Sequence, residues 1–291
     1  MTSALVPVHL HAKAMSTSDN LEETHLPPRI QAVCLDIDDT LVDFTTSARK
    51  ALCSMIGRDD MWPTWLRMTE EHVAKVVSGE MDPDTMRMAR TKAFLADLGA
   101  LLDDEAVCRL EDRRMAEASG DWRLFDDVFP CLDWLQAAGL KVAAVTNASG
   151  SHQRAKLNRL GIARFFDTVV IAGELGAAKP DPVIFRTACD NLDVPVDEAL
   201  HVGDRLDVDA LGARDAGLHG VWLDRCHAPG PRPHAGVHVI DTLGDLPELI
   251  VSEYLTPATT STSAVPGQRM PDPVSGPRAA WSTISGRHHG Q

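Results

Sequence analysis

The amino-acid sequence predicts an α/β protein with a doubly wound parallel sheet and a helical domain inserted after the first strand. Residues 32–36 form a short apolar run that leads straight into acids, which is typical of a strand covered on both faces. From residue 120 onward, strand and helix patterns alternate, as expected for parallel strands joined by right-handed crossovers. Residues 43–119 show helical periods only, so we expect them to lie outside the sheet.

The segment 43–119 predicts a small domain of four helices. Each expected helix is followed by a glycine, the residue that most often ends a helix. Asp82-Pro83 and Asp103 are suitable helix starts, because an aspartate can cap a helix and a proline fits its first turn. The expected helices are Ser47–Ile56, Trp65–Ser78, Pro83–Leu98 and Asp103–Ala118.

The core domain is expected to comprise residues 29–42 and 120–255. Its expected strands are Ala32–Asp36, Lys141–Thr146, Thr168–Ile171, Ala199–Gly203, Gly220–Leu223 and Val237–Ile240. The helices between and after them are expected near Cys131–Ala138, Ser151–Leu160, Pro182–Leu192, Asp209–Ala216 and Leu246–Tyr254. Residues 1–28 and 256–291 are rich in Ser, Thr and Pro without periodicity, which predicts a disordered leader and a disordered tail.

Composition excludes several classes of function. The formal net charge of −14 argues against non-specific binding to nucleic acid or to anionic membranes, since both require a basic surface. The six cysteines form no C-x-x-C pair, which indicates free thiols in a reducing compartment. With no signal-peptide pattern and no apolar run of membrane-spanning length, we expect a cytoplasmic protein. No heptad run or exposed strand pattern indicates an oligomer, so the oligomeric state stays open.

Polar side chains follow four of the expected strands at the point where each strand ends. They are Asp36, Asp38 and Thr40 after the first strand, Thr146 and Asn147 after the second, Lys179 after the third, and Asp204 and Asp209 after the fourth. Ligands of parallel sheets bind beyond the carboxyl ends of the strands. We therefore expect these residues to meet at one site.

The four segments resemble the four motifs of the haloacid dehalogenase (HAD) superfamily. They are A-V-C-L-D-I-D-D-T-L, T-N-A-S-G-S-H-Q-R-A-K-L-N-R-L-G, K-P-D-P-V-I-F and H-V-G-D-R-L-D-V-D-A-L-G-A-R-D-A-G, in the family's order. The resemblance covers the core from Ala32 to about Leu223 and implies a Rossmann-like fold. It also implies that residues 43–119 form the helical C1 cap of subfamily I, most similar to nucleotidases and sugar phosphatases.

The resemblance implies phosphoryl transfer, and the chemistry of the residues suits it. Asp36 can attack phosphorus and form an aspartyl-phosphate, and Asp38 can protonate the leaving oxygen and then activate water. Thr146 and Lys179 can contact the phosphoryl oxygens, and the lysine offsets the repulsion between carboxylate and phosphate. The alternative for Asp38 is a carboxylate that caps a turn or helix. Dehalogenases of the family lack the second acid, so its presence here argues against dehalogenation.

A magnesium site is expected among the acids. Mg²⁺ prefers oxygen ligands and commonly uses one or two carboxylates together with substrate phosphate. By the resemblance, the metal group comprises Asp36, the backbone carbonyl of Asp38, Asp204 and Asp209. Asp209 stands in the position of the family's second acid in the fourth motif, which contacts a metal-bound water or the lysine.

Substrate contacts are expected from the strand ends and from the inserted helices. Thr40 and Asn147 are expected to bind the substrate or its phosphate. Arg87 and Arg90 lie three residues apart on one helix face, which suits an anionic group; the alternative is a solvated cationic face.

The sequence thus predicts a Mg²⁺-dependent phosphohydrolase that acts on a small phosphorylated metabolite of the nucleotide or sugar phosphate class. Two alternatives stay open. One is a phosphotransferase or mutase of the same fold, and the other is a regulatory binding protein of that fold, for which residues 256–291 could recruit a partner.

Overall fold

The computed structural model describes residues 29–148, 150, 152–227 and 236–255. The expected leader, residues 1–28, and the expected tail, residues 256–291, lie outside the described residues. Within the described ranges, no helix is both long enough and apolar enough to cross a membrane.

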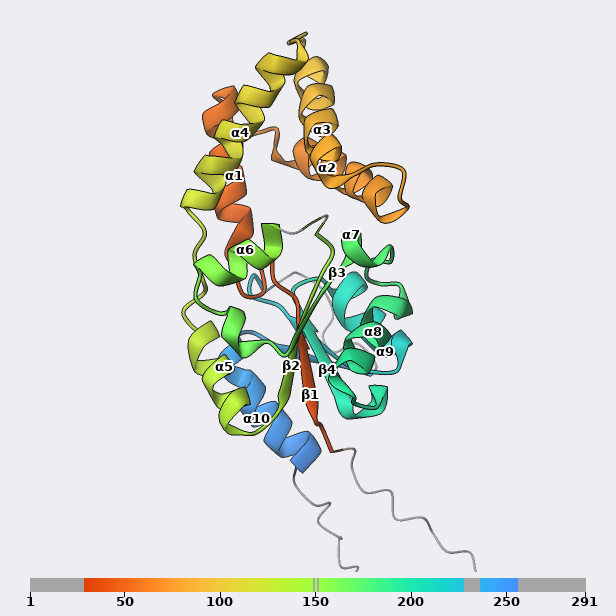
Figure 1. Ribbon diagram of the computed structural model, residues 1–291. Coiled ribbons are helices and arrows are strands. Elements are labelled where there is room, and N and C mark those ends of the chain that lie inside the picture. Colours follow the sequence, from red (N-terminus) through yellow and green to blue (C-terminus); the bar gives the residue numbers. More distant parts are fainter. Residues whose placement is uncertain (1–28, 149, 151, 228–235, 256–291) are drawn as a thin grey trace, which may run out of the picture. The chain divides into compact units, whose positions relative to one another are not determined.

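The core is a six-stranded, fully parallel sheet with the strand order β3-β2-β1-β4-β5-β6 (Figure 1). The strands are β1 (Ala32–Leu35), β2 (Lys141–Thr146), β3 (Thr168–Ile171), β4 (Ala199–Gly203), β5 (His219–Leu223) and β6 (Val237–Ile240). The order reverses between β1 and β4, and such a switch point opens a crevice at the carboxyl ends of the strands. The predicted doubly wound parallel sheet is therefore confirmed.

Helices cover both faces of the sheet (Figure 1). Val33 and Leu35 of β1 face a core cluster that includes α5 and α10, whereas Ala32 and Cys34 face a cluster that includes α8 and α9. This alternation explains why β1 is apolar without interruption, because each of its faces is buried. The helices of the core are α5 (Val128–Ala137), α6 (His152–Arg159), α7 (Ala172–Leu175), α8 (Pro182–Leu192), α9 (Leu211–Ala216) and α10 (Leu246–Ile250).

Four helices form an insertion between β1 and β2, which we call the helical insertion. They are α1 (Phe44–Ile56), α2 (Trp62–Val77), α3 (Pro83–Asp97) and α4 (Asp104–Gly120). Leu52, Trp65 and Phe94 form a small apolar core of their own, in which the two aromatic rings meet edge to face with their centroids 5.0 Å apart. As predicted, Asp82 and Asp103 cap their helices by accepting backbone N–H groups.

Several element boundaries differ from the sequence prediction. Helix α1 begins three residues early because Asp43 caps it. The helix expected over 209–216 is divided into a π-helical turn, Leu206–Ala210, and α9, and the last expected helix is divided in the same way at Val251. The short helix α7 was not predicted, because four residues are too few to show a helical period. Short 3₁₀ turns occupy Ala163–Phe165, Val196–Glu198 and Leu243–Asp245.

Candidate active site

The loop after β1 presents two acids at the edge of the sheet. The chain turns sharply at Asp39, whose φ of 64° lies in the left-handed region. The Asp39 amide donates to the Val42 carbonyl at 2.7 Å, and its carboxylate accepts from the backbone and hydroxyl of Thr45 at 2.8 and 2.6 Å. These hydrogen bonds within the loop fix the positions of Asp36 and Asp38 relative to β1.

Lys179 lies at the centre of the site and is almost fully buried. Its Nζ donates to Asp36 Oδ1 at 2.6 Å, to Asp209 Oδ1 at 2.6 Å and to the Val145 carbonyl at 2.9 Å. Burial alone would lower the pKa of Lys179, but the charges of Asp209 and Asp36 raise it above its ordinary value. Lys179 is therefore a fixed positive charge beside Asp36.

Asn147 holds the backbone of this lysine. Its Nδ2 donates to the Lys179 carbonyl at 2.8 Å, and its Oδ1 accepts from the Lys179 amide at 2.7 Å. Both ends of the amide side chain are thus engaged within the protein. Thr146 is buried at the end of β2, and its hydroxyl accepts from the Ala148 amide at 3.3 Å.

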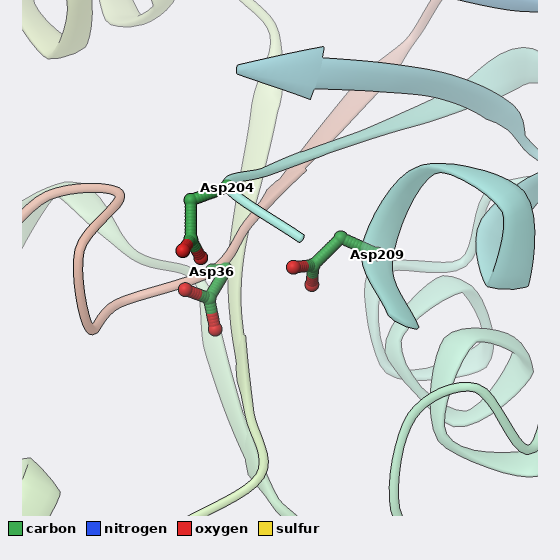
Figure 2. Close-up of side chains that lie close together, drawn as sticks. All are labelled: Asp36, Asp204 and Asp209. Carbon is green, nitrogen blue, oxygen red and sulfur yellow. The ribbon is translucent and has the colours of Figure 1, made fainter. Parts of the chain in front are cut away.

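The carboxylates of Asp36, Asp204 and Asp209 lie close together, as Figure 2 shows. Oxygens of Asp36, Asp204 and Asp209 all lie within 4.8 Å of one another. Asp209 is fully engaged: Oδ1 accepts from Lys179 and from His201 Nε2 at 3.0 Å, and Oδ2 accepts from the Arg205 amide at 3.1 Å. Within the described ranges, the carboxylate of Asp204 and the Oδ2 of Asp36 have no hydrogen-bond partner.

The electrostatics of this cluster favour a bound cation. Burial, and then the nearby charges of Asp209 and Asp38, raise the pKa of Asp36 to about 7 against the opposing effect of Lys179. Burial, followed by the charge of Asp36, raises the pKa of Asp204 to about 8. One lysine is thus shared among three buried or half-buried acids. The two acids with available oxygens fit the donor set of Mg²⁺, which would supply the missing positive charge.

The carboxylate of Asp38 accepts hydrogen bonds from two residues that the sequence analysis did not identify. Its Oδ1 accepts from Lys156 Nζ at 2.5 Å, and its Oδ2 accepts from Gln153 Nε2 at 2.8 Å. Lys156 is about 1% exposed, and its Nζ lies 4.9 Å and 5.0 Å from the ring centroids of Phe44 and Trp122. The spacing of Gln153 and Lys156, three apart on α6, was the available indication that they share a face.

The site opens into a cavity of about 930 Å³ lined by both the core and the helical insertion. Every expected site residue except Thr40 lines it; these are Asp36, Asp38, Arg87, Arg90, Thr146, Asn147, Lys179, Asp204 and Asp209. Thr40 is fully buried, and its carbonyl accepts from Arg225 Nη2 at 2.9 Å. Asp207, which follows the same strand as Asp204, is exposed and pairs with Arg205 at 3.5 Å.

Two further side chains beside the candidate site were not among the expected site residues. The buried His201 contacts Asp209 from within β4. Because Asp209 accepts, the hydrogen is assigned to Nε2, and burial lowers the pKa of His201. Arg114 of α4 lines the cavity together with Arg87 and Arg90, and is joined to Arg90 through Glu111. Arg114 is one of three arginines in a highly charged helix, and no local pattern distinguishes it from the other two.

The fold and the site together define an α/β protein with a cluster of acids at the switch point of its sheet. Residues 30–217 match the family model of the haloacid dehalogenase-like hydrolases. The chain therefore belongs to this family, as its motifs indicated.

Two relatives with similar sequences are named phosphatases. The chain is 36% identical over 203 residues to a glyceraldehyde 3-phosphate phosphatase of Methanopyrus kandleri, a match that covers 67% of this chain and 84% of that protein. It is 26% identical over 249 residues to the N-acylneuraminate-9-phosphatase of Mus musculus, covering 77% of this chain and 95% of that protein. The chain is thus a phosphatase of the HAD family, and its relatives act on small phosphorylated metabolites.

Solved structures share the fold. A HAD phosphatase from Thermococcus onnurineus is 26% identical, with a TM-score of 0.51 over 77% of this chain and 100% of that chain. The L-2-haloacid dehalogenase from Xanthobacter autotrophicus is 23% identical, with a TM-score of 0.62 over 77% of this chain and 99% of that chain. At this identity the second likeness concerns the fold alone.

Proposed function

We propose that this protein is a Mg²⁺-dependent phosphomonoesterase that cleaves a small phosphorylated metabolite through an aspartyl-phosphate on Asp36. The observation that carries the proposal is the environment of Asp36. One of its oxygens is held by Lys179 while Oδ2 has no partner within the described ranges, and the cavity opens beside it. A carboxylate held in this way can present its free oxygen to phosphorus.

In the first step, Asp36 Oδ2 forms a bond to phosphorus while the bond from phosphorus to the ester oxygen breaks. Asp38 donates a proton to the departing oxygen, so that an alcohol leaves. Lys179 and the Thr146 hydroxyl stabilise the phosphoryl oxygens. In the second step, Asp38 takes a proton from water as the water attacks phosphorus, which frees inorganic phosphate and restores Asp36.

The metal would be held by Asp36, Asp204 and the backbone carbonyl of Asp38. It would supply positive charge that brings phosphate and Asp36 together. The side chain of Asp38 is engaged by Lys156 and Gln153, which is why we assign its carbonyl. Asp209, whose oxygens are all engaged, is assigned to holding Lys179 and His201, and would reach the metal through water.

We further propose that residues 43–119 act as a C1 cap on the core of residues 29–42 and 120–255, and that the protein acts in the cytoplasm. A cap that lines the reaction cavity would limit the access of bulk water during the first step. Residues from the helical insertion do line the cavity that contains Asp36, which supports this assignment.

The test is release of inorganic phosphate from a panel of phosphorylated metabolites, with Mg²⁺ or with EDTA. Wild type should turn over with Mg²⁺ only, and Asp36→Asn should lose at least about a thousandfold in kcat because an amide cannot serve as the nucleophile. Asp97→Asn, a change of the same kind at an exposed position of α3, is the control and should match wild type.

Three outcomes would contradict the proposal. Turnover retained by Asp36→Asn would exclude this nucleophile, and turnover in EDTA would exclude the metal requirement. Phosphate that appears in a new ester rather than as inorganic phosphate would indicate a mutase or phosphotransferase instead.

A further inference from the structure

A buried ionic cluster lies on the side of the cavity formed by the helical insertion. Its centre is Glu111 of α4, which is 2% exposed. Arg114 Nε and Nη2 donate to its two oxygens at 2.8 and 2.7 Å, Arg90 Nη2 donates to Oε1 at 2.7 Å, and the Thr91 hydroxyl donates to Oε2 at 2.8 Å. Two arginines therefore share a single carboxylate.

Arg90 is the less completely paired of the two arginines. Arg114 pairs with Glu111 through two parallel hydrogen bonds, the geometry in which a guanidinium and a carboxylate satisfy each other. Arg90 is 5% exposed, yet among the described residues only its Nη2 has a hydrogen-bond acceptor, and its buried Nε has none. A buried polar group without a partner destabilises the fold, and more so when it is charged.

The remaining contact of Arg90 is aromatic. Its guanidinium lies 4.2 Å from the ring centroid of Trp65, and that of Arg114 lies 4.8 Å from the same centroid. A cation over an indole face is attracted to the ring, and this attraction replaces part of the hydration energy that the cation loses on burial. Burial, followed in the same direction by the charges of Arg114 and Arg87, still lowers the pKa of Arg90 to about 10, with Glu111 opposing.

The cluster belongs to the same cavity as Asp36. Arg87, Arg90 and Arg114 all line it, and Arg87 pairs with the exposed Asp84 at 2.7 Å. Three arginines thus stand against two acids, Glu111 and Asp84, and the lining acid of the insertion, Glu70, is paired with Arg205 of the core. One positive charge therefore remains in excess on this side. The positive charge also affects His152 of α6, which lines the cavity as well. Burial, followed by the charge of Lys156, lowers the pKa of His152 to about 4, and the charges of Arg87 and Arg90 add to this effect.

We propose that Arg90, together with Arg87, binds a second anionic group of the substrate, so that the enzyme takes phosphomonoesters that carry a carboxylate or a second phosphate. This inference rests on the proposed function. The anion would supply the acceptor that Arg90 lacks and would neutralise the surplus charge, while the scissile phosphate lies at Asp36. Arg114 and Glu111 act as the rigid support that holds Arg90 in place.

The first measurement compares kcat/KM for matched esters. 3-Phosphoglycerate against glycerol 3-phosphate tests a carboxylate, and fructose 1,6-bisphosphate against fructose 6-phosphate tests a second phosphate. Wild type should favour the ester with the extra anion by about tenfold or more in at least one pair, as expected for one charge-assisted hydrogen bond or more. The pair that shows the preference identifies the anion.

The second measurement repeats the better pair with Arg90→Gln. This variant should lose most of the preference through a higher KM for the anionic ester. The control Arg109→Gln changes an exposed arginine of α4 that pairs with Glu105, and should keep the wild-type preference. Arg87→Gln, at a partly exposed side chain, provides a second variant should Arg90→Gln fail to fold, and should also reduce the preference.

The inference is overturned if wild type turns over the matched esters equally, or if both arginine variants keep the preference. These outcomes differ from a failure of the proposed function, in which wild type would release no phosphate from any ester in the presence of Mg²⁺.

Discussion

Side chains in the active site are held by partners far away in the chain. Lys156 contacts Asp38 across 118 positions, and Lys179 contacts Asp36 across 143. Each contact joins an acid from the loop after β1 to a cation supplied by a different crossover. The local pattern around either residue does not reveal the partner, because the pattern reports only on neighbours in sequence.

Lys156→Met should impair the role of Asp38. Without the ion pair, Asp38 loses its fixed orientation for protonating the departing oxygen, so kcat for an alkyl phosphate should fall by about tenfold or more. The fall should be much smaller for p-nitrophenyl phosphate, whose leaving group departs without a proton. Steady-state kinetics on both esters measures the difference.

The control for this prediction is Lys92→Met, at an exposed lysine of α3 that pairs with Asp104. It should leave both rates as they are. An equal loss on the two esters in Lys156→Met would show that the lysine supports the fold rather than the proton transfer.

At the scale of elements, the end of β4 and the π-helical turn after it are packed against each other without space for a methyl group. A Cβ on Gly203 would lie 2.2 Å from Asp209 Cγ. Asp209 cannot move aside without losing its hydrogen bonds to Lys179, His201 and the Arg205 amide. The glycine is therefore required by the active site and not by its own backbone angles.

Gly203→Ala should lower the free energy of unfolding by about 1–3 kcal/mol, the usual effect of overpacking. Phosphatase activity should fall by more than the fraction of unfolded protein can explain, because the displaced Asp209 no longer holds Lys179. Urea unfolding and phosphate release measure the two effects. Gly120→Ala, at a glycine of α4 where nothing outside its own helix backbone and chain neighbours lies within 4 Å of the added Cβ, should leave activity unchanged and should not lower stability; a fully active Gly203→Ala would contradict the argument.

At the scale of the whole molecule, arginine-paired carboxylates lie in both the insertion and the core. Glu111 pairs with Arg114 and Arg90 in the insertion, and Asp127 pairs with Arg225 in the core at 2.8 Å. Burial alone would raise the pKa of each acid, but the arginines lower both below their ordinary values. An acid whose pKa is lowered by folding stabilises the fold at pH values above its unfolded-state pKa. This contribution is lost as the pH falls through the folded-state pKa.

The protein should therefore lose stability from about pH 4.5 downward, where Glu111 begins to titrate in the unfolded chain. Glu111→Gln should be less stable at pH 7 by about 3–5 kcal/mol, because it leaves two buried guanidiniums without an anion. Its unfolding midpoint in urea should also depend less steeply on pH below 4.5. Glu105→Gln, at an exposed glutamate, should stay within about 0.5 kcal/mol of wild type. An unchanged acid slope in Glu111→Gln would contradict the assignment.

Much of the architecture could be predicted from the sequence because strand and helix periods are properties of consecutive residues. The apolar run of β1 and the alternation after residue 120 were sufficient to predict a parallel, doubly wound sheet. Boundaries were less accurate where a single side chain decides them, as Asp43 does for α1. The division of the expected helix at Leu211 also escaped prediction, since a π-helical turn has no sequence pattern of its own.

By itself the sequence determined the six strands, the main helices, their order along the chain, and the acids that stand at the ends of β1 and β4, because these depend on local pattern and on the rule that parallel strands end at one edge. Only the tertiary structure decided how the acids are used. It brings Lys156 to the carboxylate of Asp38, and it lets the Asn147 amide bind the Lys179 backbone through both its oxygen and its nitrogen. It also places Arg90 against a carboxylate, Glu111, that a second arginine shares. These outcomes depend on distances between side chains that meet only when the helices and strands are packed.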